Sequence, residues 1–322
     1  MKRLAVLTSG GDAPGMNACI RAIVRAGLQK GLEIMGFVRG YQGVVAGDFR
    51  LLDSRSVSNI LQRGGTILHT ARCPDFQTEE GLQRGAKTLS QVQVDALLVI
   101  GGDGSFRGAH ELSRFWKGQI IGLPGTIDND LYGTDFTIGF DTAVMTALES
   151  IDKIRDTADA HERFFLVEVM GRHSGFIALE VGVTGGAEEI LVPEVPVDLP
   201  AICERLCAGK RRGKASSIIV VAEGAYEGGA YAVAEELRKL SGCDYRVCVL
   251  GHIQRGGSPS ANDRLLASKL GVYAVDEALR GATGVMAGQI NAELLLTPLP
   301  DTWGKRKAVD ASLARIARIL AT

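Results

Sequence analysis

The sequence predicts an α/β protein built from mostly parallel, doubly wound sheets that are flanked by helices. Three observations favour this class. Short apolar runs alternate with longer amphipathic stretches through almost the whole chain, which is the βαβα pattern of such folds. Most runs are continuous Val, Ile and Leu without polar alternation, as in strands covered on both faces. Glycine accounts for 41 of 322 residues and clusters after several runs, where it indicates functional turns rather than linkers.

The expected strands are the apolar runs themselves, in chain order 4–8, 34–38, 96–100, 120–123, 164–169, 189–192, 217–222, 246–250 and 285–290. The first expected helix begins near Pro14 and carries Ile20, Ile23, Val24 and Leu28 on one stripe. The other expected helices cover approximately 143–156, 199–209, 232–240, 262–279 and 307–320. A chain of this length usually divides into two lobes.

Composition excludes several classes of protein. The chain carries 36 Lys+Arg against 37 Asp+Glu, a net charge of −1, which argues against a binder of nucleic acid or of membrane surfaces. No apolar run is long enough to span a membrane. The apolar start at 4–7 ends too soon for a signal peptide. Six scattered cysteines without a Cys-x-x-Cys pair suggest neither disulfides nor zinc. We therefore expect a cytoplasmic protein.

Four glycine-rich segments directly follow expected strands, where open α/β sheets bind their ligands. The first is TSGGDAPGMN at 8–17. Its glycines let a phosphate approach the backbone, and the helix that follows favours anions at its N-terminus. It matches neither standard nucleotide-binding motif. Taken alone, a tight turn between strand and helix explains this segment equally well.

The second and third segments add carboxylates. In GGDGS at 101–105, Asp103 offers one hard oxygen ligand, which suits Mg²⁺ bridged to phosphates; a turn with Asp103 as N-cap is the alternative. In PGTIDND at 124–130, Asp128 and Asp130 are costly to crowd together unless a metal or a basic partner neutralises them. Phosphoryl transfer needs such a base and such a carboxylate. An Asx-rich surface loop is the weaker alternative.

The fourth segment is LGHIQRGGSP at 250–259, in which His252 and Arg255 are suited to bind a sugar phosphate. A lone histidine is more often structural, so His252 counts only through its neighbours. The stretch QRGGS within this segment echoes QRGGT at 62–66, but the match is too short to indicate a repeat.

Arg21 and Arg25 lie one turn apart on the first expected helix, and neither has an acidic residue three or four positions away. Like charges at this spacing are mildly destabilising. The pair therefore suggests an anion from outside the chain, with a solvated helix face as the alternative.

Together these segments, with MGR at 170–172, resemble bacterial-type ATP-dependent 6-phosphofructokinases over essentially the whole chain. The resemblance implies the phosphofructokinase fold, with two lobes that each contain a mostly parallel sheet flanked by helices. It implies transfer of the ATP γ-phosphate to the 1-hydroxyl of fructose 6-phosphate, which gives fructose 1,6-bisphosphate and ADP, with Mg²⁺ as cofactor. The implied larger, ATP-binding lobe is 1–139 plus 253–303. The implied smaller, sugar-phosphate lobe is 140–252 plus 304–322.

The resemblance also assigns roles by position. Asp128 would be the base, Asp103 the Mg²⁺ ligand, and Thr126, Arg172 and Arg72 would act on the transferred phosphoryl group. The implied ATP-binding residues are Gly11, Tyr41, Arg72, Cys73, Gly102, Asp103, Gly104 and Ser105. The implied fructose 6-phosphate residues are Thr126, Asp128, Asp130, Arg163, Met170, Gly171, Arg172, Glu223, Arg246, His252 and Arg255. Of these, Arg163 and Arg246 would reach the 6-phosphate from a neighbouring subunit of a homotetramer.

A regulatory nucleotide-diphosphate site between subunits is implied as well, with ADP as activator and phosphoenolpyruvate as inhibitor. Its matching positions are Arg21, Arg25, Arg55, Arg155, Gly186, Glu188, Arg212 and Lys214. Ala215 and Ser216 follow Lys214, where several relatives carry a lysine and a histidine. Fewer donors at these positions should weaken effector binding.

Three alternatives are considered. Pyrophosphate-dependent phosphofructokinases typically carry Asp and Lys at the positions of Gly104 and Gly125, so the two glycines favour ATP. NAD and lipid kinases with a Gly-Gly-Asp-Gly turn lack the PGTIDND and HIQRGG segments. A catalytically dead sensor is disfavoured because the positions of Asp103, Thr126, Asp128 and Arg172 are all filled.

Overall fold

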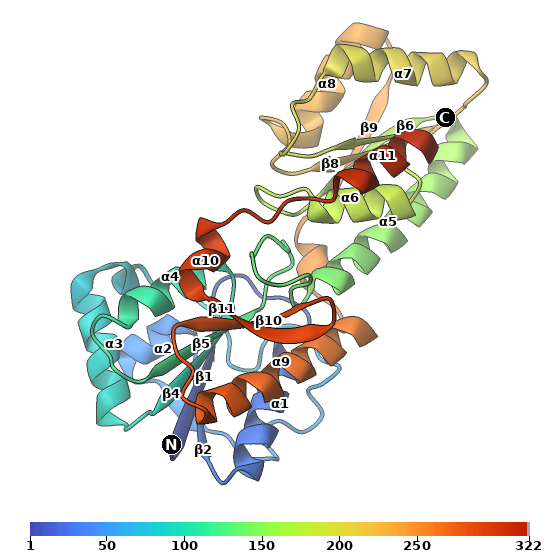
Figure 1. The fold of residues 1–322 in the computed structure, drawn as a ribbon. Helices are drawn as coiled ribbons and strands as arrows, with labels where there is room; N and C mark the ends of the chain where they lie inside the picture. The colour runs from blue at the N-terminus through green and yellow to red at the C-terminus, as the bar shows by residue number, and fades with distance from the viewer. Residues whose placement is uncertain (321–322) are drawn as a thin grey trace. The chain divides into compact units, whose positions relative to one another are not determined.

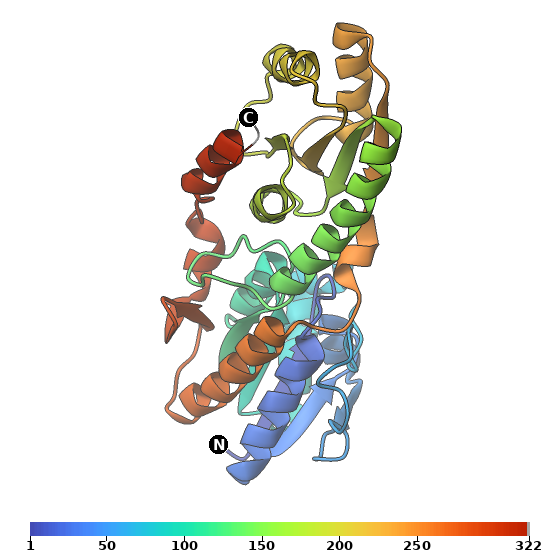
Figure 2. The same cartoon turned by 90° about the vertical axis from the view of Figure 1, so that its right-hand side faces the viewer.

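The computed structural model describes residues 1–320, and the chain folds into two compact units (Figures 1 and 2). Unit 1 consists of Met1–Ile127, Leu131–Thr142 and Arg255–Lys307. Unit 2 consists of Asp128–Asp130, Ala143–Gln254 and 308–320. Residues 321 and 322, which belong to the expected second lobe, lie outside the described residues. The chain therefore leaves unit 1 and returns to it more than once.

Unit 1 is built on a seven-stranded sheet with the order β11-β10-β5-β4-β1-β2-β3. The inner strands pair in parallel, and the two edge strands, β3 and β11, pair antiparallel. The central strand β4 is buried at every position, because its sequence ALLVIG is apolar on both faces. The strands are β1 (Arg3–Thr8), β2 (Glu33–Phe37), β3 (Phe49–Leu51), β4 (Ala96–Gly101), β5 (Gln119–Pro124), β10 (Val285–Ile290) and β11 (Glu293–Pro298).

Helices cover both faces of this sheet (Figure 1). Helix α1 packs against α9 on one face, and α2, α3 and α4 enclose a core with Phe37, Phe106 and Trp116 on the other. The side chains of Thr78 and Ser260 cap the N-termini of α3 and α9 by accepting hydrogen bonds from backbone N–H groups. The helices are α1 (Met16–Gln29), α2 (Tyr41–Ala46), η1 (Pro74–Gln77), α3 (Glu79–Gln91), α4 (Asp103–Leu112), α9 (Ala261–Leu279) and α10 (Leu299–Gly304).

Unit 2 contains a four-stranded parallel sheet with the order β7-β8-β6-β9. A core of Leu166, Ile219 and Val221 lies under α7 and α8. The strands are β6 (Phe164–Val169), β7 (Glu189–Leu191), β8 (Ser217–Ala222) and β9 (Tyr245–Val249). The helices are α5 (Phe140–His161), α6 (Phe176–Thr184), α7 (Leu199–Arg211), α8 (Gly229–Ser241), η2 (Gly251–Arg255) and α11 (Ala311–Leu320), of which α5 and η2 begin or end in unit 1.

Every expected strand and helix is present, and the α/β class is confirmed. Two boundaries are corrected. The first helix begins at Met16 rather than near Pro14, because Gly15 has φ 108° and cannot be helical. The last begins at Ala311 rather than Lys307, because the carboxylate of Asp310 accepts the backbone N–H of Ser312 and sets the helix start there.

Several elements were not expected. Helix α6 is apolar almost throughout, FIALEVGVT, and so shows no helical periodicity. Helix α4 starts inside the glycine-rich segment, while α2, α10 and β3 are very short. Within the described residues, no helix is long and apolar enough to cross a membrane.

Candidate active site

The three glycine-rich segments that follow β1, β4 and β5 lie together at one edge of the unit 1 sheet. Adjacent pairing sets this arrangement, because Thr8 is paired with Ile100 and Gly101 with Pro124. Carboxyl ends of parallel strands meet at the same edge. The approach is close, since a Cβ at Gly101 would lie 2.7 Å from the carbonyl oxygen of Ser9. The segments are held further by Thr70, whose hydroxyl donates to the carbonyl of Gly10 over 2.7 Å.

Tyr41, an expected ATP-binding residue, lies in the core beneath this edge. Its ring stacks on Phe76 with centroids 4.0 Å apart, and its hydroxyl donates to the carbonyl of Ser105. Burial raises the pKa of Tyr41 far above its usual value, so the phenol remains a donor. Its side chain thus fixes the backbone of the loop that begins α4.

Asp103 is the first residue of α4, after Gly102, which has extended backbone angles. Its side chain is 39% exposed, and Arg107 Nε lies 3.9 Å from its Oδ2. A Cβ at Gly102 would lie 3.6 Å from the Cβ of Thr126, so Asp103 begins its helix beside Thr126. The carbonyl of Thr126 is fixed by the hydroxyl of Thr137 over 2.6 Å.

These residues fit a magnesium ion that is bound mainly through phosphates. No group of three or more His, Cys, Asp or Glu side chains that could enclose a metal occurs in the described part of the chain. Mg²⁺ keeps several waters and usually takes only one or two carboxylates besides substrate phosphates. A single, partly exposed Asp103 at a helix N-terminus matches that donor set.

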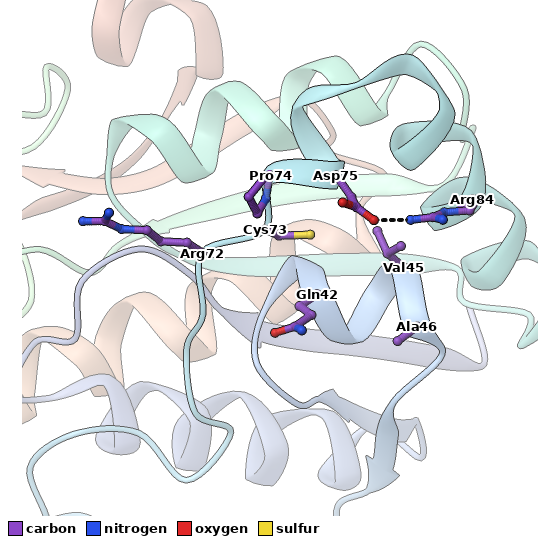
Figure 3. Close-up of a pocket in the computed structure, with 8 residues that line it drawn as sticks. All are labelled: Gln42, Val45, Ala46, Arg72, Cys73, Pro74, Asp75 and Arg84. Atoms are coloured by element: carbon purple, nitrogen blue, oxygen red, sulfur yellow. Dashed lines mark hydrogen bonds and ion pairs between the residues drawn. The ribbon is translucent and has the colours of Figure 1, made fainter.

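A pocket of about 390 Å³ lies in unit 1 beside this edge, and its size suits a small molecule. Figure 3 shows Cys73 at its wall and the Arg72 side chain extending away on one side. Three lining residues, Gln42, Asp75 and Arg84, belong to none of the glycine-rich motifs, and the last two form an ion pair of 2.5 Å (Figure 3). The lining residues are Gln42, Val45, Ala46, Arg72, Cys73, Pro74, Asp75 and Arg84.

Arg255 and Gly11 are in direct contact, although the resemblance placed them with different substrates. A Cβ at Gly11 would lie 1.9 Å from Arg255 Nη1, and that atom donates to the carbonyl of Asp12 over 3.3 Å. Glycine at position 11 therefore makes room for the guanidinium. The structure also joins the two echoing segments, since Ser258 Oγ donates to the carbonyl of Gln62 over 2.8 Å.

In unit 2, the turn after β6 carries Met170, Gly171 and Arg172. Gly171 has φ 146° and Arg172 has φ 53°, so the turn is strained and needs support. Glu223 supplies it, because its Oε1 accepts the N–H groups of Gly171 and Arg172 over 3.2 and 2.7 Å. Buried Gln254 accepts the N–H of Met170 over 2.8 Å. Gln254 lies within the HIQRGG segment but was not among the expected site residues, because its role depends on a partner far away in the sequence.

Asp128 is attached to the same turn. Its side chain is 5% exposed, and its carbonyl accepts the hydroxyl of Ser174 over 2.8 Å. The next residue, Asn129, has φ 54°, which turns the chain sharply between the two aspartates. Asp130 is partly exposed. Unit 2 therefore brings Asp128 together with the turn of Met170, Gly171 and Arg172.

The remaining expected sugar-phosphate residues lie on the surface of unit 2. Arg163, just before β6, and His252, in η2, are exposed. Arg246 in β9 is half exposed and pairs with Asp244 at 3.0 Å. Because these positively charged or titratable groups face solvent, they are available to a ligand or to another subunit.

Five of the expected regulatory residues, Arg155, Gly186, Glu188, Arg212 and Lys214, belong to unit 2. Arg155 Nη2 donates to the carbonyls of Gly185 and Gly186 over 2.6 and 2.8 Å, and Lys214 pairs with Glu188 at 2.9 Å. Arg212 is exposed at the end of α7.

The other three regulatory positions belong to unit 1. Arg21 and Arg25 lie on α1, and Arg55 lies in an exposed turn. Within residues 1–320 no ion pair is formed by Arg21 or Arg25.

A two-unit α/β fold whose glycine-rich turns after the strands carry carboxylates and arginines is typical of proteins that bind phosphorylated ligands. Within that class, the family model for phosphofructokinase matches residues 3–278. The chain belongs to the phosphofructokinase family, as the motifs predicted.

The relatives agree in name. The chain is 57% identical over 321 residues to ATP-dependent 6-phosphofructokinase 1 of Thermus thermophilus, covering 100% of both. It is 49% identical over 330 residues to the ATP-dependent 6-phosphofructokinase of Halothermothrix orenii, covering 99% of both.

Solved structures show the same fold. Phosphofructokinase from Saccharomyces cerevisiae matches with a TM-score of 0.89 and 35% identity, over 100% of this chain and 48% of that one. A pyrophosphate-dependent phosphofructokinase from Marinobacter aquaeolei matches with a TM-score of 0.85 at 23% identity, which indicates a common fold only.

Proposed function

We propose that this protein is an ATP-dependent 6-phosphofructokinase, which transfers the γ-phosphate of ATP to the 1-hydroxyl of fructose 6-phosphate. The observation that carries the proposal is the meeting of the segments after β1, β4 and β5 at one sheet edge, with Asp103, Gly104 and Thr126 side by side along them. Relatives that match over their full length carry the same activity in their names.

The ATP phosphates would bind to the backbone N–H groups of Gly11 and of the first turn of α4, where a helix N-terminus favours anions. Asp103 would hold Mg²⁺, which supplies charge neutralisation of the phosphates when bound. Thr126 and Arg72 would donate to the transferred phosphoryl group, whose equatorial oxygens carry the charge of the transition state. The base and ribose would enter the pocket beside Cys73.

Asp128 would accept the proton of the sugar 1-hydroxyl as that oxygen attacks phosphorus. The turn that carries Arg172 is fixed by Glu223 and Gln254, and such preorganisation lowers the cost of aligning charges in the transition state. His252 and Arg255 would bind the sugar phosphate with Asp130, Met170 and Gly171. Arg163 and Arg246 of a neighbouring subunit would complete the 6-phosphate site in a homotetramer.

The choice of ATP over pyrophosphate is supported at two glycines. A Cβ at Gly104 would meet nothing within 4 Å, so the space beside it is free of protein atoms and can take the rest of a nucleotide. A Cβ at Gly125 would lie 2.7 Å from Ile100 Cγ2 and 3.2 Å from Met16 Cε. The packing therefore disfavours the lysine that pyrophosphate-dependent enzymes carry there.

Regulation by ADP and phosphoenolpyruvate is proposed for the site of Arg21, Arg25, Arg55, Arg155, Gly186, Glu188, Arg212 and Lys214. Support comes from the absence of ion pairs at Arg21 and Arg25 within residues 1–320, since like-charged arginines at this spacing favour an external anion. A cytoplasmic location is proposed too, and six free cysteines fit a reducing compartment.

One coupled assay tests the proposal, with ATP or pyrophosphate as donor and fructose 6-phosphate as acceptor. Turnover with ATP and little with pyrophosphate is expected. Preference for pyrophosphate would reject ATP as the donor. Phosphorylation of NAD or diacylglycerol instead of the sugar would reject fructose 6-phosphate as the acceptor. Binding of both ligands without turnover would support a sensor.

A further inference from the structure

Arg107 lies on α4, one turn after Asp103. Long side chains on a helix point back toward its N-terminus, and Arg107 Nε accordingly lies 3.9 Å from Asp103 Oδ2. The helix macrodipole disfavours a cation at the N-terminal end of a helix. It favours a carboxylate there, so Asp103 needs no arginine to stabilise its charge. At 3.9 Å, with the two side chains 55% and 39% exposed, the ion pair itself contributes little.

A second contact keeps the guanidinium in this place. The Arg107 Cζ lies 5.2 Å from the centre of the Trp303 ring, within the range of a cation–π interaction. Trp303 belongs to α10, which packs against α4 (Figure 1), and the ring also packs against the hydrophobic core of unit 1. The ring of His110, one turn further along α4, is tilted by 64° from the Trp303 ring, with the two ring centres 5.9 Å apart. The arginine therefore lies on a fixed aromatic surface.

We propose that Arg107 is a further nucleotide-binding residue, held by Trp303 so that its guanidinium contacts the phosphates of the bound nucleotide. The inference rests on the proposed ATP site. It explains why a cation is kept beside the N-terminal turn of α4, where Gly104 leaves open space. A planar guanidinium with several donors suits phosphate oxygens better than an ammonium group does.

The chain offers a matched control close to the same helix. Arg114, just beyond the end of α4, is also exposed and also pairs with a carboxylate, Glu111, at 2.8 Å. Its guanidinium lies over Phe115 rather than Trp303. If any exposed arginine near α4 strengthened nucleotide binding, Arg107→Gln and Arg114→Gln would behave alike.

Calorimetry of ADP binding without sugar measures the effect apart from catalysis. Every protein in this series carries Arg21→Ala and Arg25→Ala, so that the proposed regulatory site does not contribute to the ADP binding that is measured. Arg107→Gln should weaken ADP binding by about 5- to 20-fold, Arg107→Lys by less, and Arg114→Gln hardly at all. The loss should be similar with Mg²⁺ and with EDTA. Equal affinity of Arg107→Gln and the unchanged protein would overturn the proposal. A loss seen only with Mg²⁺ would also overturn it, because Arg107 would then act solely through Asp103.

Fluorescence gives an independent measurement. In a Trp116→Phe background, Trp303 is the only tryptophan. ADP should change its emission, because phosphates bound to the Arg107 guanidinium alter the charge that lies over the Trp303 ring. The change should vanish in Arg107→Gln, and its persistence would contradict the inference. If the unchanged protein turns over fructose 6-phosphate normally and Arg107→Gln binds ADP with unchanged affinity, this inference alone is rejected. Failure of the unchanged protein to bind ADP or ATP would reject the proposed function as well.

Discussion

At the scale of single residues, Asp128 is the side chain on which the proposed chemistry depends most directly. It is 5% exposed and held beside the Arg172 turn through Ser174. We expect Asp128→Asn to reduce turnover by about 10²–10⁴-fold, because an amide cannot accept the sugar proton. Fructose 6-phosphate binding should change little, which isothermal calorimetry would check. Near-normal turnover of the variant would remove the assignment of Asp128 as base.

Gly11 provides a second prediction at this scale. A methyl group at this position would overlap Arg255 Nη1, and a flexible side chain can move away. Gly11→Ala should therefore leave the melting temperature nearly unchanged but weaken fructose 6-phosphate binding by roughly 3- to 10-fold, because Arg255 is displaced. Gly104→Ala, whose Cβ meets open space, is the matched control for sugar affinity. A Gly11→Ala protein with normal sugar affinity would show that Arg255 does not bind the sugar phosphate.

The sequence indicates which residues follow the strands, but not which residues support them. Asp103, Asp128 and Arg172 stand out because their neighbours are glycines and buried strands. Gln254 supports Met170 from 84 positions away, and Asp75 meets Arg84 only because η1 and α3 bring them to one pocket. Such contacts depend on tertiary packing and leave no local pattern.

At the scale of elements, Asp263 joins two helices. It is 1% exposed in the first turn of α9, and it accepts the N–H groups of Gly139 and Thr142, each over 2.8 Å, and the hydroxyl of Thr142. Its carboxylate therefore caps the start of α5. We expect Asp263→Asn to lower the free energy of unfolding by about 1–3 kcal/mol at neutral pH, because buried donors lose their acceptor.

The pH dependence of this effect has a definite sign. Burial raises the pKa of Asp263 above its usual value, so the folded state binds this proton more tightly than the unfolded state does. The contribution of the group is greatest below the ordinary carboxyl pKa and decreases as the pH rises from about 4 through the raised value. Chemical denaturation at several pH values should show that the difference in the free energy of unfolding between the unchanged protein and Asp263→Asn becomes smaller as the pH rises. A gap that widens would contradict the raised pKa.

Gly64 tests the contact between the two echoing segments. A Cβ there would lie 2.2 Å from the carbonyl oxygen of Gly257, and backbone on both sides leaves little room to relax. Gly64→Ala should destabilise the protein by about 1–3 kcal/mol, measured by urea unfolding. The same change at Gly209, in helix α7 and with only ordinary contacts to Lys214, should be neutral or stabilising by about 0.5–1 kcal/mol. If both substitutions change the free energy of unfolding equally, the contact between Gly64 and Gly257 does not determine the stability at this site.

Among elements, the central strands of both sheets were predictable, whereas the two edge strands of the unit 1 sheet, β3 and β11, were not. Continuous apolar runs mark β1, β4 and β8 because these strands are buried on both faces. The edge strand β3 has three exposed residues, and β11 is largely exposed and ends in Pro298. Because β3 and β11 are largely exposed, their sequences show little of the apolar pattern that marks a buried strand.

At the scale of the whole molecule, the proposed tetramer makes a prediction about mixed subunits. If Arg163 reaches the 6-phosphate of a neighbouring subunit, Asp128→Asn and Arg163→Ser remove different parts of one shared site. Each variant alone should be nearly inactive. Tetramers assembled from both should regain part of the activity, because some sites then combine an intact Asp128 with an intact Arg163. Co-expression and a turnover assay check this, and no recovery would place Arg163 in its own subunit's site or outside the site.

Unit 1 is interrupted along the chain, and this has a consequence for the order of events during translation. Strand β10 pairs with β5, yet more than a hundred residues of unit 2 are made between them. A nascent chain that has just left the ribosome through β5 exposes an unsatisfied row of backbone groups along that strand. The sheet is complete only after residue 298 emerges. A prematurely terminated chain would therefore keep an exposed, aggregation-prone edge on β5, where β10 and β11 should pair.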